Sequence, residues 1–172
     1  MSGKAQAKVA TPATTLLKAR KVDFQLCLYD YVDHGGTARA ASELGVPEAA
    51  VIKTLVFEDQ AHKPLLVLMH GDQEVSQKAL AKAIGASSVT PCTPEAATRH
   101  TGYLVGGISP FGTRKQLPVL AEKSIFDLDA IYINAGRRGA LARMAPGALR
   151  ELLAVSEASI AKPRRDSCTP PG

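Results

Sequence analysis

The chain has 172 residues, of which 45% are hydrophobic and 22% are charged, and its formal net charge is +5. This length supports one domain with a hydrophobic core, and the apolar runs are too short to cross a bilayer, so we expect a single domain without a membrane segment. The N-terminus carries lysines with no apolar stretch behind them, unlike a secretory signal, so we expect a cytoplasmic protein.

Cysteines and histidines give no sign of a disulfide framework or a zinc site. The cysteines are an odd number at wide spacings without a C-x-x-C pair, so we expect no structural metal and no cofactor. The cysteines are Cys27, Cys92 and Cys168. The histidines, which we interpret as mostly solvated surface residues, are His34, His62, His70 and His100.

Basic residues gather in three places: Arg114-Lys115, Arg137-Arg138, and the C-terminal group Lys162, Arg164 and Arg165. Two of these groups flank glycine turns, where a phosphate backbone could be held. Solvated surface charge explains the same composition equally well.

The first half of the chain alternates helices and strands. We expect a flexible leader over residues 1–10, and Thr11-Pro12 predicts a helix start because threonine caps and proline fits the first turn. The predicted elements are a helix to about Lys21, a half-buried strand from Val22 to Tyr29, a helix from Thr37 to Leu44 ended by Gly45, a strand from Val51 to Phe57, a strand from Pro64 to Met69, a helix from Ser76 to Ile84, a strand from Ser88 to Thr90 and a helix from Thr93 to His100.

Lys53 is the most informative single charge, because it stands inside the apolar strand Val51 to Phe57. An ammonium is costly to bury without a partner. Lys53 must therefore face solvent, a carboxylate, or a cleft that receives an anionic ligand.

The stretch from Gly102 to Gly112 reads as a short apolar strand that runs into a loop with Gly106, Gly107 and Pro110. Glycines permit unusual backbone angles and close approach of a ligand to peptide N–H groups, and proline stiffens the turn. Such a loop can cradle a phosphate, a ribose or an oxyanion, or it can be a tight connection between strands.

The remaining chain predicts strands from Leu117 to Leu120, from Ile131 to Ile133 and from Leu141 to Met144, a turn over Asn134 to Gly139, and a helix from Pro146 to about Val155. Because no regular βαβ repeat is visible, we expect an α+β fold with a mixed sheet. Residues 159–172 are predicted to be a disordered basic tail.

Common catalytic motifs are absent from the sequence, including G-x-S-x-G, H-E-x-x-H, a Walker sequence and a G-x-G-x-x-G that opens a helix. Sequence alone places no histidine beside Cys27, Cys92 or Ser109. The remaining features suit a site that binds a nucleotide end and stabilises charge with little covalent participation by the protein.

Three segments resemble the YbaK/EbsC family of Cys-tRNA(Pro) deacylases, which are free-standing relatives of the editing domain in bacterial prolyl-tRNA synthetases. They are Lys53-Thr-Leu, Thr101-Gly-Tyr-Leu-Val-Gly-Gly-Ile-Ser-Pro-Phe-Gly112 and Ile131-Tyr-Ile-Asn-Ala-Gly-Arg-Arg-Gly139. The resemblance runs from about Thr11 to Val155, and we assign residues 11–158 to the domain. It implies a single domain with a curved mixed β-sheet, partly closed like a barrel, surrounded by helices.

The resemblance also implies the ligand, the 3′-terminal aminoacyl-adenosine of a mischarged tRNA. Lys53 is then expected to hold the acceptor end, and the loop Gly106, Gly107, Ile108, Ser109 and Pro110 to position the aminoacyl ester. In the cysteine-specific members the substrate thiol attacks its own ester carbonyl and releases a cyclic thiolactone. Further residues expected to bind substrate are Tyr29, Thr54, Asn134, Gly136, Arg137 and Arg138.

The sequence departs from the cysteine-specific pattern at three positions. The serine of that pattern aligns with Asn134, its aspartate aligns near Leu141, and its aromatic residue is replaced by Gly36. We predict a deacylase acting in trans on Cys-tRNA(Pro) or Cys-tRNA(Cys), with prolyl-tRNA synthetase as a partner and a monomer as the expected state. Two alternatives stay open, a non-hydrolytic module that binds tRNA or a synthetase, and a deacylase for another small amino acid such as alanine.

Overall fold

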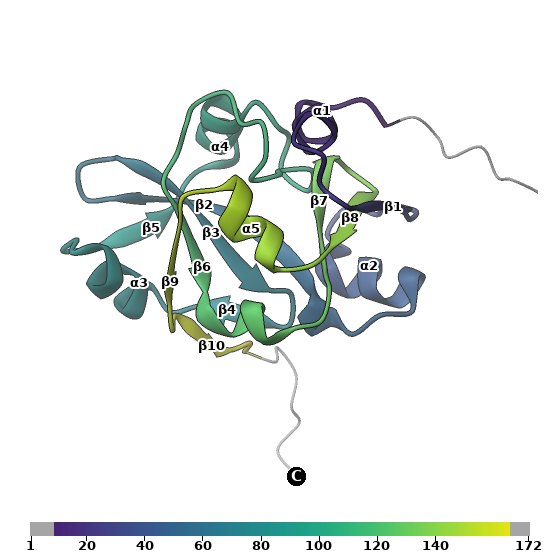
Figure 1. Cartoon of the computed structure of the whole chain (residues 1–172). Coiled ribbons are helices and arrows are strands. Elements are labelled where there is room, and N and C mark those ends of the chain that lie inside the picture. The colour runs from purple at the N-terminus through teal and green to yellow at the C-terminus, as the bar shows by residue number, and fades with distance from the viewer. Residues whose placement is uncertain (1–8, 166–172) are drawn as a thin grey trace, which may run out of the picture.

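The computed structural model describes residues 9–165, which form a large mixed sheet with helices packed on it (Figure 1). The hydrogen-bonded order is β1-β8-β7-β2-β3-β6-β9, and β5 pairs with β2 to give eight strands. The strands are β1 (Gln25–Leu28), β2 (Val51–Asp59), β3 (Pro64–His70), β4 (Gln73–Val75), β5 (Val89–Pro91), β6 (Val119–Glu122), β7 (Ile131–Arg137), β8 (Ala140–Met144), β9 (Val155–Ala158) and β10 (Ala161–Pro163). This arrangement confirms the predicted α+β fold, whereas the expected partial closure of the sheet stays a prediction.

The helices begin and end where the sequence predicts, except at the last one. They are α1 (Pro12–Ala19), α2 (Gly36–Leu44), α3 (Gln77–Ile84), α4 (Pro94–Thr101) and α5 (Gly147–Leu152), with 3-10 turns η1 (Glu48–Ala50) and η2 (Lys123–Asp127). Thr11 and Thr93 accept hydrogen bonds from the backbone N–H groups of Thr14 and Ala96, which caps α1 and α4 as expected. None of the described helices is long and apolar enough to cross a membrane.

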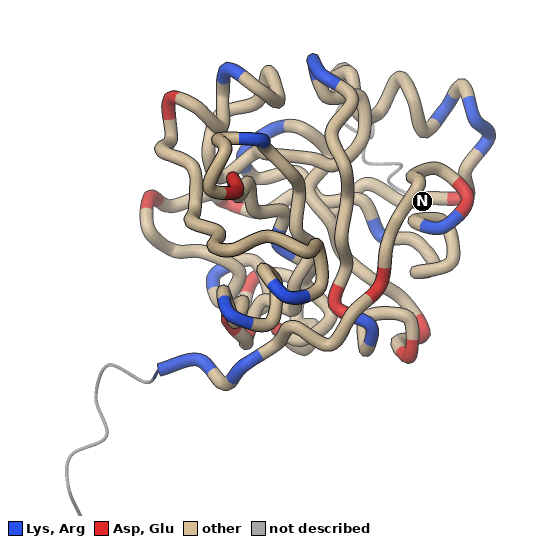
Figure 2. The backbone as a smooth tube through the Cα atoms, turned by 90° about the vertical axis from the view of Figure 1, so that its left-hand side faces the viewer, with Lys and Arg blue, Asp and Glu red and all other residues tan. Residues whose placement is uncertain are grey.

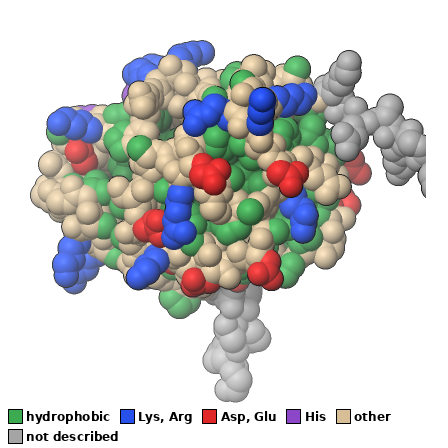
Figure 3. Space-filling model, viewed as in Figure 1, with side chains coloured by type: hydrophobic (Ala, Val, Ile, Leu, Met, Phe, Trp, Pro, Cys, Tyr) green, Lys and Arg blue, Asp and Glu red, His purple; other side chains and the backbone are tan. Residues whose placement is uncertain are grey.

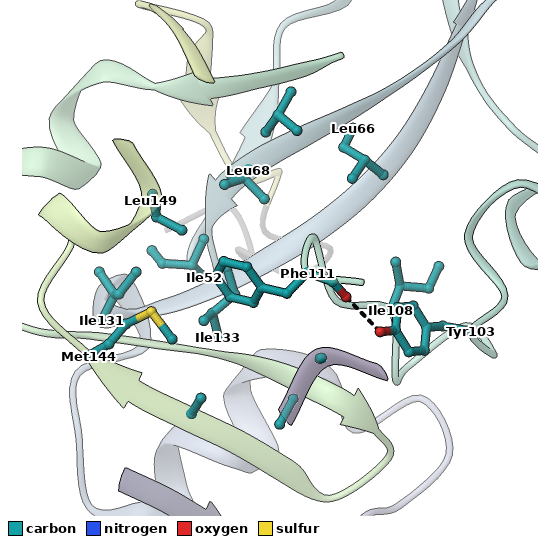
Figure 4. Close-up of a cluster of buried hydrophobic side chains, with 14 of the residues drawn as sticks. Ile52, Leu66, Leu68, Tyr103, Ile108, Phe111, Ile131, Ile133, Met144 and Leu149 are labelled. Atoms are coloured by element: carbon teal, nitrogen blue, oxygen red, sulfur yellow. Dashed lines mark hydrogen bonds between the residues drawn. The ribbon is translucent and has the colours of Figure 1, made fainter. Parts of the chain in front are cut away.

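The alternation along β3 explains why both faces of the sheet are buried. Leu66 and Leu68 point into a core beneath α1, α5 and the glycine loop, whereas Val67 and Met69 pack toward Leu80 of α3. Figure 4 shows the first core, in which Phe111 is fully buried and accepts a hydrogen bond at its carbonyl from the Tyr103 hydroxyl at 2.6 Å. The glycine loop is therefore anchored to the core at its C-terminal end.

Three local predictions are wrong in the second half of the chain. Residues 103–105 form no strand, because Tyr103 turns inward to bond Phe111 and the Gly107 N–H bonds the Leu104 carbonyl at 2.8 Å. The predicted turn at Asn134 is part of β7, which continues to Arg137 through an irregularity in its pairing with β8. The last helix ends at Leu152, and β9 follows it because the edge of β6 offers backbone groups to pair with.

Both predicted termini of the domain need correction. Val9, placed in the flexible leader, is only 1% exposed and belongs to the core, while residues 1–8 lie outside the described part. The predicted disordered tail is wrong at Ala161–Pro163, which pairs with β4 as β10. Cys168 and the rest of residues 166–172 are not described.

The histidine prediction is also wrong at two positions. His70 is 6% exposed, and its ring nitrogens lie 2.6 Å from the Ala49 carbonyl and 2.8 Å from the Ser124 hydroxyl. His100 is 9% exposed, and its ring lies 3.2 Å from the Lys115 amine. These two imidazoles are part of the folded interior, whereas His34 and His62 are exposed.

Candidate functional site

An interruption in strand pairing along β2 creates the candidate site. One edge of β2 pairs continuously with β3. The other edge pairs with β7 only at Val51 and Ile52, and with β5 only from Phe57 to Asp59. Residues 53–55 therefore present a strand edge at the point where β7 and β5 separate, and a cavity of about 900 Å³ opens there. Crevices where neighbouring strands diverge are common places for ligands.

Seven of the twelve predicted site residues line this cavity, and five do not. The lining residues are Tyr29, Lys53, Thr54, Gly106, Ile108, Asn134 and Arg138. Those outside it are Gly107, Ser109, Pro110, Gly136 and Arg137. The structure thus brings together segments separated by more than a hundred residues in sequence.

One side of the cavity, which we call the charged wall, consists of Thr37, Glu48, Lys53 and Arg164. The Lys53 amine donates a long hydrogen bond of 3.5 Å to the Gly71 carbonyl. Thr37 Oγ1 lies 3.1 Å from the same carbonyl and 2.9 Å from Glu48 Oε1. Arg164 donates from Nη1 to Glu48 Oε1 at 2.8 Å. This chain of contacts connects the two cations across the wall.

Lys53 is half-buried, and burial lowers the pKa of its ammonium below the ordinary lysine value. Glu74 is the strongest of three carboxylates that raise this pKa, and the cation of Arg164 opposes them. The charge of Lys53 is therefore costly in the ligand-free cavity and would be stabilised by an anion.

The opposite side, which we call the loop wall, consists of Gly106, Ile108, Asn134 and Arg138. Gly106 has a φ of +92°, and a Cβ there would lie 2.8 Å from the Tyr31 hydroxyl. In the described part of the chain, the N–H groups of Gly106 and Ile108 donate to no backbone or side-chain acceptor. Both residues line the cavity.

Asn134 and Arg138 fasten the glycine loop to the turn between β7 and β8. Asn134 Nδ2 donates to the Gly106 carbonyl at 3.0 Å, and Oδ1 accepts the N–H groups of Gly136 and Arg137 at 2.7 and 3.1 Å. Arg138 Nε donates to the Val105 carbonyl at 2.9 Å, and its guanidinium lies 5.2 Å from the Tyr31 ring centre. Both the amide nitrogen and the amide oxygen of Asn134 are thus hydrogen-bonded to backbone groups.

Three of the five predicted residues outside the cavity make contacts that shape the loop. A Cβ on Gly107 would lie 2.9 Å from the Arg138 backbone nitrogen, so glycine lets the two turns touch. Ser109 is fully buried, and its hydroxyl accepts the Phe111 N–H at 3.2 Å. Gly136 has a φ of +92° and packs against Tyr103.

Neither Cys92 nor Tyr29, which both line the cavity, is activated as a nucleophile. Cys92 lines it, but burial and the neighbouring Glu58 raise the pKa of its thiol to about 11, which keeps it protonated at neutral pH. Burial likewise raises the pKa of Tyr29. Thr54 Oγ1 is buried without a hydrogen-bond partner. In residues 9–165 no cluster of three or more His, Cys, Asp or Glu side chains could hold a metal ion.

The sequence did not predict Tyr31, Glu48 or Arg164 as site residues, although all three line the cavity. Tyr31 follows the predicted Tyr29 by two positions, so the alternation of a strand could have suggested it. Glu48 and Arg164 carry no local signal, because their position depends on η1 and on the pairing of β10 with β4.

The chain belongs to the aminoacyl-tRNA editing domain family, whose model matches residues 34–152. Both walls of the cavity except Arg164 fall within the matched range.

Among individual proteins, the chain is similar to EbsC of Enterococcus faecalis, which its name provisionally assigns as a Cys-tRNA(Pro)/Cys-tRNA(Cys) deacylase. The two are 32% identical over 145 residues, covering 83% of this chain and 87% of EbsC. This chain is also 29% identical to a proline–tRNA ligase of Levilactobacillus brevis, and the match covers 72% of this chain but only 22% of that enzyme. The matched segment is therefore a small part of the ligase.

Two crystal structures share the fold. One is the hypothetical protein APE2540, with a TM-score of 0.81, 24% identity and coverage of 88% of this chain and all of that chain. The other is described as a candidate trans-editing enzyme for prolyl-tRNA synthetase, with a TM-score of 0.79, 21% identity and coverage of 90% and 99%.

Proposed function

We propose that this protein removes a wrongly attached amino acid from tRNA in trans, with Cys-tRNA(Pro) as the preferred substrate and Cys-tRNA(Cys) as a further one. The observation that carries the proposal is the cavity in the gap of β2, with Lys53 on one side and Gly106 on the other, in a chain of the aminoacyl-tRNA editing family. Its similarity to EbsC supports the choice of cysteine.

In the proposed complex, the cavity holds the terminal aminoacyl-adenosine, and Lys53 binds the acceptor end. The N–H groups of Gly106 and Ile108 stabilise the negative charge that develops on the ester carbonyl oxygen, because preformed donors there need no reorganisation. Asn134 positions this loop through the Gly106 carbonyl. Tyr29, Thr54 and Arg138 line the space around the substrate.

The substrate supplies the nucleophile in this mechanism. The cysteine sulfur forms a bond to its own carbonyl carbon, the bond from that carbon to the ribose oxygen breaks, and the thiol proton ends on the ribose hydroxyl. The products are a cyclic thiolactone and uncharged tRNA. A protonated Cys92 and a buried Ser109 are consistent with a cavity that lends no nucleophile of its own.

The test is to incubate the purified chain with Cys-tRNA(Pro), Ala-tRNA(Pro) and Pro-tRNA(Pro) and to follow loss of the ester. We expect rapid loss from Cys-tRNA(Pro) and none from Pro-tRNA(Pro). Equal loss from Ala-tRNA(Pro), whose amino acid has no thiol, would contradict the thiol mechanism and would indicate that water attacks the ester. Binding of tRNA without acceleration for any substrate would replace deacylation with the alternative of a binding module.

We further propose that prolyl-tRNA synthetase works beside this protein, because the chain resembles part of that enzyme and is similar in fold to a candidate trans-editing protein. Co-sedimentation of the two proteins with and without tRNA(Pro) measures this interaction. Absence of a complex in both conditions would contradict it.

A further inference from the structure

The C-terminal segment delivers a second cation to the cavity. Arg164 follows β10 directly and lines the cavity, although it lies 12 residues beyond the end of the family match at residue 152. Figure 2 shows basic residues along this segment where it leaves the body of the protein. On the face seen in Figure 3, by contrast, basic and acidic side chains are interspersed.

Buried contacts fix the position of this segment. Ile160 is 1% exposed, and its N–H and that of Ala161 donate to Glu122 Oε1 at 2.9 and 3.1 Å. The Ser76 N–H donates to the Ile160 carbonyl at 2.7 Å, and β10 then pairs with β4. The backbone therefore holds Arg164 at the cavity before any ligand arrives.

The guanidinium is oriented by Glu48. Arg164 donates from Nη1 to Oε1 at 2.8 Å and from Nη2 to Oε2 at 3.5 Å. The Arg164 side chain is 43% exposed and that of Glu48 is 18% exposed, so the pair lies at the rim of the cavity rather than in its depth. An exposed ion pair contributes little to stability, so its main effect is to orient the guanidinium.

The position of Arg164 at the rim determines which part of an RNA it would meet. The cavity of about 900 Å³ is large enough for one nucleoside with a small aminoacyl group, and a strand whose 3′ end lies inside would leave past this exposed rim. The first negative charge outside is the phosphate that joins the terminal adenosine to the nucleotide before it. A planar guanidinium matches the geometry of phosphate oxygens.

We propose that Arg164, together with Lys53, forms a subsite for this internucleotide phosphate. The inference rests on the proposed function, since it assumes that an RNA 3′ end enters the cavity. Glu48 orients the Arg164 guanidinium in the absence of RNA, and its carboxylate competes with the phosphate for that guanidinium. Removing the arginine and removing the competing charge should therefore have opposite effects on RNA binding.

The experiment measures binding of the full chain to a fluorescein-labelled single-stranded RNA ending in CCA. A second RNA carries an uncharged methylphosphonate at its last linkage. We expect Arg164→Ala to weaken binding of the first RNA about fivefold to tenfold and to reduce the slope of log affinity against log salt by about 0.7. It should not change binding of the second RNA.

Two further variants complete the test. Arg165→Ala is the matched control, because Arg165 is exposed and does not line the cavity, and it should bind both RNAs like the wild type. Glu48→Gln should tighten binding of the first RNA. If the pair served only to hold the fold, Glu48→Gln and Arg164→Ala would both weaken binding, and that result would overturn the proposal.

The outcome separates this inference from the proposed function. Equal behaviour of Arg164→Ala and Arg165→Ala, or an equal loss on both RNAs, would remove the subsite even if the wild type deacylates Cys-tRNA(Pro). Conversely, a wild type that binds RNA through Arg164 but deacylates nothing would remove the proposed activity and keep the subsite.

Discussion

The two walls of the cavity are built in different ways. The loop wall comes from two short segments, and its donors are backbone N–H groups fixed by glycines, Asn134 and Arg138. The charged wall comes from α2, η1, β2 and the residue after β10, and its groups are ionised side chains. Backbone donors suit a charge that appears only during reaction, whereas fixed cations suit a charge that is present throughout.

Removing the charged wall's central cation should have the largest effect. Lys53→Ala is expected to lower deacylation of Cys-tRNA(Pro) by about a hundredfold or more, because in the proposed complex this partly desolvated cation binds the acceptor end. Lys63→Ala, an exposed lysine in the turn between β2 and β3, is the control. Steady-state kinetics together with circular dichroism check this. Near-wild-type turnover of a folded Lys53→Ala protein would show that the charged wall does not contribute to deacylation.

The second-largest effect is expected when the glycine loop is pushed away from the turn between β7 and β8. In Gly107→Ala the new Cβ would lie 2.9 Å from the Arg138 nitrogen and 3.1 Å from the Arg137 carbonyl carbon, and backbone atoms cannot move away cheaply. We expect a loss of about 1–3 kcal/mol in the free energy of unfolding, with a matching loss of activity. Gly147→Ala is the control, since nothing lies within 4 Å of its Cβ. Urea unfolding of both variants decides the point, and similar stability would contradict the close contact.

A smaller effect is expected from Asn134→Ala, which removes the hydrogen bond that joins the glycine loop to β7. It removes one donor and one acceptor and leaves the N–H groups of Gly136 and Arg137 unpaired, which costs about 1–2 kcal/mol. Because the loop would move, kcat should fall more than KM rises. Gln116→Ala, at an exposed position, serves for comparison. A change in KM alone would indicate that Asn134 contacts the substrate and does not position the loop.

A pH titration can test the anchor beneath the charged wall. Burial raises the pKa of Glu122, but hydrogen bonds from Ser124, Ile160 and Ala161 outweigh it, and the folded-state pKa lies below the ordinary value. The carboxylate therefore stabilises the fold above its unfolded pKa of about 4.3, and this stabilisation is lost as pH falls through the lower folded value. Glu122→Gln should be less stable than wild type at pH 7, and the gap should shrink below pH 4. Chemical unfolding at both pH values measures it, and a constant gap would contradict the assignment.

The smallest effect is expected at Cys92, where a mechanism with a protein nucleophile would predict the largest. Cys92→Ala should change deacylation less than about twofold, because a thiol with a pKa near 11 is protonated at the assay pH. Kinetics on Cys-tRNA(Pro) at pH 7 and 8 check this. A loss comparable to that of Lys53→Ala would place a protein nucleophile in the cavity.

Local chemistry accounts for the elements that the sequence predicts correctly. Helix ends were found from local chemistry, since the caps at Thr11 and Thr93 and the stops at Gly45 and Gly85 act within one turn of chain. The strands β9 and β10 were missed, because each forms on an edge supplied by a distant strand and carries little propensity of its own.

The sequence by itself determined the helices, the central strands, the family resemblance and most of the loop wall, because glycine turns and a lysine within an apolar strand are local features. Only the tertiary structure decided that β7 and β5 separate along β2, that Ser109 and Pro110 do not line the cavity, and that Arg164 does. These outcomes depend on strand pairing and burial between segments far apart in the chain, which no single window of sequence contains.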